Sequence, residues 1–134
     1  MVVGVDAELE EKSDYDVMQI EDRVVSQFEG LSISTQEVRE RVDEVLQPLG
    51  VETSLLVIRR ANSLALLFTC LTLSALMSLR DQWRSRRLRD IVQSLFTFLS
   101  GATRTVAIKR LTWPLADYNR RFELLRFLQG ELVI

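Results

Sequence analysis

The sequence contains no histidine, one cysteine, two prolines and five glycines in 134 residues. Without histidine, the chain lacks the usual general base of hydrolytic triads and the paired histidines of the HExxH zinc motif. A single cysteine excludes an internal disulfide and any zinc or iron–sulfur site built from several cysteines. The scattered glycines form no phosphate-binding loop of the GxGxxG or GxxxxGK[ST] kind. We therefore expect no catalytic, cofactor-binding or metal-binding residues, and we interpret the protein as a non-enzyme.

Acidic and basic residues are distributed unevenly along the chain. Residues 1–53 contain fourteen acidic and four basic residues, whereas residues 54–134 contain five acidic and thirteen basic residues. Nearly all the basic residues are arginines, which suit paired and interface positions better than lysines do. Because the acidic part also has the apolar spacing of helices, we interpret it as a half that folds against the basic half. The alternative is an acidic arm that binds a partner.

Residues 1–12 combine a short apolar stretch with several acidic residues, and they lack the basic start and long apolar run of a signal peptide. We expect them to form a flexible acidic tail. The rest of the chain has a suitable length for one domain with its own core, so residues 13–134 are predicted to form a single helical domain. The expected location is intracellular, either cytoplasmic or nuclear, with membrane association as an alternative.

Two segments of the acidic half have the three- and four-residue apolar spacing of amphipathic helices. The first covers residues 14–30. The second begins at Ser34, which lies three residues before Glu37 in the spacing of a capping box, and it ends near residue 50. Each predicted helix therefore has one apolar face to bury against a core.

The most distinctive segment is the uncharged stretch 61–79. Six of its nineteen residues are Asn, Ser or Thr, and they are scattered around a helical projection. A helix that is apolar all round lies either at the centre of a bundle or in a bilayer. Because neighbouring helices need an apolar surface to pack on, we predict a central helix over about residues 54–77, with Cys70 as a small buried side chain. The alternative is a single membrane span at 61–79 with an arginine-rich cytoplasmic flank.

Three further helices are predicted after the central one. The segment 80–100 has one apolar stripe and is separated from the central helix by a break near Ser78. Residues 102–111 have the β-branched composition of a strand, but we assign a short helix because no partner strand is evident. A last helix begins at Pro114 and extends to about residue 129. The segments together predict an all-α fold, a compact bundle of five or six helices around a central apolar helix.

Two surfaces are candidates for binding another protein. The first is Trp83 with the arginine-rich turn after it, since tryptophan beside arginine is typical of interfaces. Those arginines are Arg84, Arg86, Arg87 and Arg89. The second surface is the outer stripe of the last helix, which consists of Leu124, Phe127 and Leu128. The alternative interpretation is that Trp83 packs on a neighbouring loop and the arginines pair with acidic residues of the first half.

These features predict a non-catalytic helical adaptor, or a subunit of a larger assembly, that binds another protein with an acidic and apolar surface. The arginines would steer the partner and the aromatic side chains would hold it. A second copy of the chain is an alternative partner. The alternative functions are a single-span membrane protein and an arginine-mediated nucleic-acid-binding module. Nucleic acid is the less favoured partner because the chain has a net charge of −2.

Overall fold

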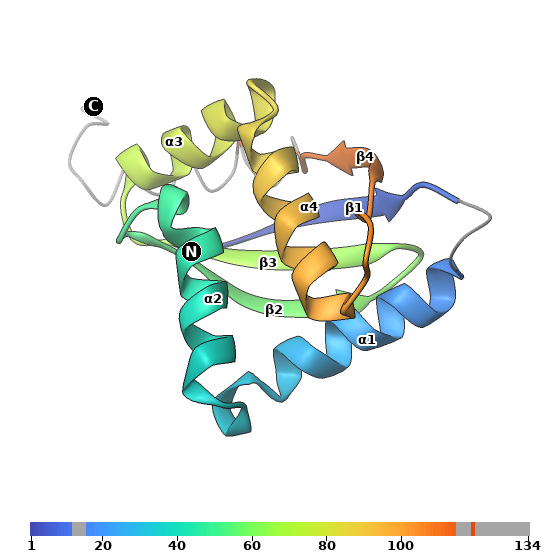
Figure 1. The fold of residues 1–134 in the computed structure, drawn as a ribbon. Helices are drawn as coiled ribbons and strands as arrows, with labels where there is room; N and C mark the ends of the chain where they lie inside the picture. Colours follow the sequence, from blue (N-terminus) through green and yellow to red (C-terminus); the bar gives the residue numbers. More distant parts are fainter. Residues whose placement is uncertain (12–15, 115–118, 120–134) are drawn as a thin grey trace, which may run out of the picture.

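The computed structural model describes residues 1–11, 16–114 and 119 of the chain. These residues form a four-stranded antiparallel sheet with helices packed on it (Figure 1). In chain order the elements are β1 (Val2–Leu9), α1 (Val17–Glu29), η1 (Leu31–Ile33), α2 (Gln36–Leu46), η2 (Gln47–Leu49), β2 (Thr53–Arg60), β3 (Leu64–Cys70), α3 (Leu73–Arg84), α4 (Arg87–Ser100) and β4 (Ile108–Thr112). The fold is therefore α/β, and the prediction of an all-α bundle is wrong.

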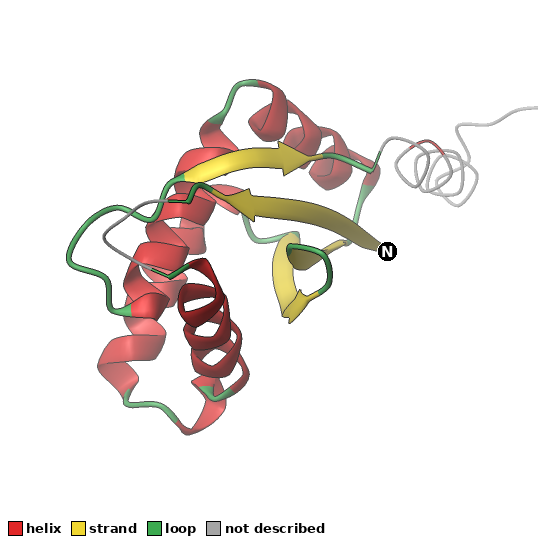
Figure 2. Cartoon of the chain, turned by 90° about the vertical axis from the view of Figure 1, so that its right-hand side faces the viewer, coloured by secondary structure: helices red, strands yellow, loops and turns green. Residues whose placement is uncertain are grey.

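The strands are arranged in the order β2-β3-β1-β4, and every neighbouring pair is antiparallel. Consequently β1 runs parallel to β2, and β3 runs parallel to β4. A pair of α-helices makes each of these two parallel connections. With each pair counted as one crossover, the connectivity is β-α-β-β-α-β, the split β-α-β arrangement. Helices α1 and α4 lie side by side against one face of the sheet, as the two views in Figures 1 and 2 show.

The prediction of a flexible acidic tail at residues 1–12 is wrong, because Val2–Leu9 form strand β1. Its alternate side chains Val3, Val5, Ala7 and Leu9 are buried in the core, while the residues between them are more exposed. This two-residue period is the signature of a half-buried strand. Because β1 pairs with β3 on one side and with β4 on the other, it is an inner strand of the sheet.

The hairpin of β2 and β3 occupies most of the segment predicted as the central helix at 54–77. The two strands are joined by a tight turn at residues 61–63, in which the Ala61 amide donates to the Ser63 carbonyl at 2.8 Å. Strand β3 is an inner strand that is buried over most of its length, so its apolar residues form an almost continuous run. Such a run does not distinguish a buried strand from a buried helix by periodicity alone.

The stretch 61–79 is consequently divided between β3 and the first half of α3. In the part of the chain that the structure describes, no helix combines the length and apolarity needed to cross a membrane. The proposed single span at this position is therefore not supported.

The amphipathic helices of the acidic half are confirmed as α1 and α2. Asp16 caps α1 by accepting a hydrogen bond from the Met18 amide at 2.9 Å. The cap of α2 is Thr35, whose hydroxyl accepts from the Val38 amide at 3.4 Å. The capping residue is thus one position later than the predicted Ser34.

The helix predicted over residues 80–100 is confirmed where it coincides with α4, but its predicted start is wrong. The break between helices lies at Ser85 and Arg86, and not near Ser78, which is inside α3. The apolar stripe of α4 is buried as predicted; it consists of Leu88, Val92, Leu95 and Leu99.

The remaining predictions concern the end of the chain. The prediction of a short helix at 102–111 is wrong. Strand β4 begins at Ile108 and pairs with β1, which lies about a hundred residues earlier in the sequence. The helix predicted over about 114–129 lies outside the described residues apart from Pro114 and Asn119. Its candidate stripe of Leu124, Phe127 and Leu128 is likewise outside them.

Candidate functional site

The junction between α3 and α4 is a sharp turn with an unusual backbone. Helix α3 ends at Arg84, and Arg86 adopts φ 68° and ψ 7° immediately before α4 begins. For a residue with a side chain, this left-handed conformation costs roughly 1–2 kcal/mol. The turn is held by backbone hydrogen bonds from Ser85 to Asp81 at 2.9 Å and from Arg86 to Trp83 at 3.2 Å. The strained turn projects several arginines from one short stretch of chain.

Trp83 connects this turn to the edge strand β4. Its indole Nε1 donates to the Leu111 carbonyl at 2.9 Å, and its ring centroid lies 5.8 Å from that of Trp113, with the planes tilted by 34°. Trp113 is buried, whereas Trp83 is half-buried. Trp83 therefore packs on a neighbouring segment, as the alternative interpretation held, but part of its side chain remains exposed. The hydrogen bond to Leu111 and the ring contact with Trp113 fix its position.

Helix α4 is tied to the same strand by side chains that bond to its backbone. The Arg89 guanidinium donates to the Ile108 carbonyl, and the Gln93 side-chain carbonyl accepts from the Ile108 amide at 2.9 Å. Buried main-chain groups at the start of β4 are thereby satisfied by α4. As a result, α3, α4 and β4 meet at one corner of the molecule and are joined by hydrogen bonds.

A hollow of about 520 Å³ lies at this corner, and we call it the arginine pocket. Four of its six lining residues are arginines, and the other two are apolar. The lining consists of Arg80, Trp83, Arg84, Arg86, Arg89 and Leu111. Arg84 and Arg86 are exposed, and within the described ranges neither they nor Arg89 form an ion pair with a carboxylate. The pocket therefore combines a concentration of positive charge with an aromatic wall.

The structure brings together four of the five residues predicted for the first binding surface. Trp83, Arg84, Arg86 and Arg89 all line the pocket, whereas Arg87 is exposed but lies outside the lining. Sequence reasoning missed Arg80 and Leu111. Arg80 could have been found, since it precedes Arg84 by one helical turn. Leu111 could not, because it reaches the pocket only through the pairing of β4 with β1.

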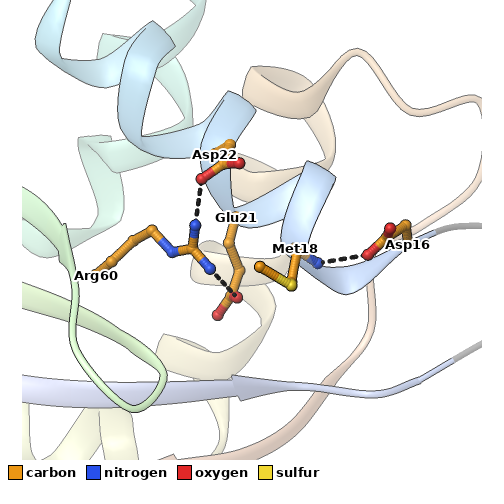
Figure 3. A network of polar contacts seen from close by, with 5 residues as sticks. All are labelled: Asp16, Met18, Glu21, Asp22 and Arg60. Carbon is orange, nitrogen blue, oxygen red and sulfur yellow. Dashed lines mark hydrogen bonds and ion pairs between the residues drawn. The ribbon is translucent and has the colours of Figure 1, made fainter.

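A second cluster of charges joins the acidic and basic halves of the chain. Arg60, at the end of β2, reaches between two carboxylates of α1 (Figure 3): its guanidinium contacts Asp22 Oδ1, and it lies 3.4 Å from Glu21 Oε1. Burial raises the pKa of the Glu21 carboxyl above its ordinary value; the nearby charge of Arg60 opposes this shift, and that of Asp22 adds to it. The cluster fits a structural role, the docking of α1 on β2.

Neither a reactive thiol nor a metal site emerges from the described residues. Cys70 is fully buried, and burial raises the pKa of its thiol, which keeps it in the unreactive protonated form. Its sulfur lies 4.0 Å from the Thr53 hydroxyl in the core. No group of three or more Cys, Asp or Glu side chains within the described ranges is placed to hold a metal ion.

Comparison with known proteins adds no relative to this description. No protein-family model matches the chain, and neither a curated protein nor a solved structure matches it. The function is therefore inferred from the geometry and charge of the arginine pocket.

Proposed function

We propose that this protein is a non-catalytic interaction module, an adaptor or a subunit of a larger assembly, whose arginine pocket binds an acidic and apolar segment of another protein. The observation that carries the proposal is the pairing state of Arg84 and Arg86. Both are exposed and line the pocket, and no carboxylate of the described chain neutralises either of them. A guanidinium is well suited to bidentate recognition of a carboxylate or phosphate on a partner.

The apolar part of the pocket supports a protein partner. Trp83 and Leu111 present an aromatic and an aliphatic surface beside the arginines. Interfaces commonly contain a few central aromatic anchors, and tryptophan and arginine are enriched among the residues that dominate binding energy. Complementary charge accelerates association, while the aromatic contact slows dissociation. As part of this proposal we place the module inside the cell, where a free thiol such as Cys70 stays reduced.

The proposal is tested by selecting binders from a displayed library of random peptides with the full-length protein as bait. We expect the enriched peptides to combine Asp or Glu with an aromatic or aliphatic residue. Synthetic versions are then titrated against the wild type and against Arg84→Ala and Arg86→Gly. Each substitution should weaken binding at least tenfold, and higher salt should weaken it as well.

Arg87→Ala is the matched control for these variants. It removes one positive charge from the same turn but leaves the pocket lining complete, so we expect less than a threefold effect on binding. The proposal is overturned if the enriched peptides carry no acidic residues, or if Arg84→Ala and Arg86→Gly bind them as well as Arg87→Ala does. Binding of a single-stranded oligonucleotide through the same arginines, with no peptide binding, would also overturn it.

A further inference from the structure

The arginine pocket concentrates more positive charge than one carboxylate requires. Arg84, Arg86 and Arg89 line it, and Arg84 and Arg86 are exposed without an ion pair among the described residues. Arg89 uses one donor on the Ile108 carbonyl, and a guanidinium has five in total. A carboxylate carries a single charge, which one guanidinium in bidentate geometry can match. A phosphoryl group carries about −1.5 to −2 at pH 7 and has three acceptor oxygens, so it can engage two or more arginines at once.

The remaining wall of the pocket is apolar and held in place. The Trp83 ring is fixed on one edge by its hydrogen bond to the Leu111 carbonyl and is backed by Trp113. An aromatic ring on the ligand would gain an offset or tilted contact with Trp83 and remove apolar surface from water. An anion without a ring would leave this wall in contact with solvent.

The size of the pocket is compatible with such a two-part ligand. Its volume of about 520 Å³ lies within the range of about 300–1,000 Å³ that is common for sites that enclose small organic groups. An aromatic ring with a phosphoryl group at its far end would place the ring beside Trp83 and the phosphoryl group among the arginines.

From these features we infer that the acidic group bound by the pocket is a phosphorylated tyrosine side chain of the partner protein. The inference rests on the proposed function, because it specifies which group of a partner the pocket takes. Phosphoserine carries the same anion but has no ring to cover Trp83. Glutamate lacks both the second charge and the ring. A free nucleotide has a ring and a phosphate, and it serves as a competing outcome in the test.

The first experiment uses small probes on the full-length protein. The chemical shift of the Trp83 indole N–H, assigned by its loss in Trp83→Phe, is followed during titration with phenyl phosphate, benzoate, inorganic phosphate and adenosine monophosphate. We expect phenyl phosphate to bind at least tenfold more tightly than each of the other three. The second experiment measures binding of four peptide pools that share random flanks and differ at one central position, which is phosphotyrosine, phosphoserine, glutamate or tyrosine. The phosphotyrosine pool should bind at least tenfold more tightly than the others.

The variants distinguish pocket binding from a change of fold. Because Arg86 has φ 68°, glycine suits this position without strain, and Arg86→Gly removes one guanidinium while preserving the turn. We expect Arg86→Gly and Arg84→Ala to weaken binding of phenyl phosphate and of the phosphotyrosine pool at least tenfold. Arg87→Ala should change either affinity less than threefold.

The outcomes separate this inference from the proposed function. Equal affinity for the glutamate and phosphotyrosine pools, lost together in Arg84→Ala, overturns the phosphotyrosine assignment and leaves the proposed function intact. Tighter binding of adenosine monophosphate than of phenyl phosphate overturns the assignment in favour of a nucleotide. Absence of binding by every pool and by every peptide from the display selection overturns both.

Discussion

The carboxyl group of Glu21 contacts Arg60 where α1 docks on β2, but its burial disfavours the ionised form that this contact needs. It is nearly buried where α1 meets β2, and it faces the partly exposed guanidinium of Arg60. Burial penalises the ionised form and raises the pKa of Glu21, and the charge of Arg60 compensates only in part. Because the folded pKa lies above the ordinary value of 4.5, the folded state binds more protons than the unfolded state between these two values. Stability therefore decreases as the pH rises through that window.

We predict that Glu21→Gln removes this contribution to the pH dependence. The free energy of unfolding of the variant, relative to the wild type, should increase as the pH rises from 4 to 7. The amide keeps the shape of the side chain but does not titrate. Urea denaturation at a series of pH values measures the effect, with Glu29→Gln on the exposed side of the same helix as control. A difference between variant and wild type that stays constant over this range would contradict the argument.

Strand β1 replaces the flexible tail that was predicted at the start of the chain. Its register joins it to β3, for example Val5 opposite Leu66, and to β4, for example Ala7 opposite Leu111. The strand thus supplies backbone partners to both neighbours, which would otherwise be separated. Its apolar side chains add to the core beneath α1 and α4. An element with these roles contributes to global stability, whereas a flexible tail would contribute little.

We predict that Val5→Ala lowers the free energy of unfolding by about 2 kcal/mol. The substitution removes two fully buried methyl groups, each worth about 0.8 kcal/mol, and leaves a small cavity. Val2→Ala is the control, because Val2 is on the same strand but 36 % exposed; its effect should stay within about 0.5 kcal/mol. Equal and negligible effects of the two substitutions in urea denaturation would argue that residues 2–9 do not pair in solution.

At the scale of the whole molecule, the sheet joins residues that are far apart in sequence. Strands β1 and β4 are adjacent although about a hundred residues separate them, and the two crossovers between parallel strands are interleaved. The contact between Trp83 and Trp113, and with it the arginine pocket, requires β4 to be in place. Completing this arrangement costs loop-closure entropy before the long-range contacts stabilise it.

The refolding rate is therefore predicted to be that of a mixed α/β domain. We expect the tryptophan fluorescence to recover over milliseconds or longer after dilution from urea, whereas local helical bundles fold in microseconds to milliseconds. Stopped-flow fluorescence measures this rate, and Trp113→Phe identifies the part of the signal that comes from the Trp83–Trp113 pair. Recovery of the full signal in much less than a millisecond would contradict the role assigned to β4.

Local sequence patterns were sufficient for the helices that bury one face. Helices α1, α2 and α4 follow from apolar spacing along a single segment, since a helix satisfies its own backbone and exposes its periodicity in sequence. The grouping of Trp83 with Arg84, Arg86 and Arg89 was also visible, because these residues lie within two turns of chain. The burial of Cys70 followed from its uncharged surroundings.

The strands needed the tertiary structure, because a strand is stabilised by partners that its own sequence does not specify. The two-residue alternation of Val3, Val5 and Ala7 was present in the sequence, but it became decisive only once β3 and β4 were available to pair with it. The β-branched composition before Leu111 was ambiguous for the same reason. The amino-acid sequence by itself therefore determined the amphipathic helices and the arginine-rich turn. Only the tertiary structure decided the sheet, and with it the apolar wall that makes the turn a pocket.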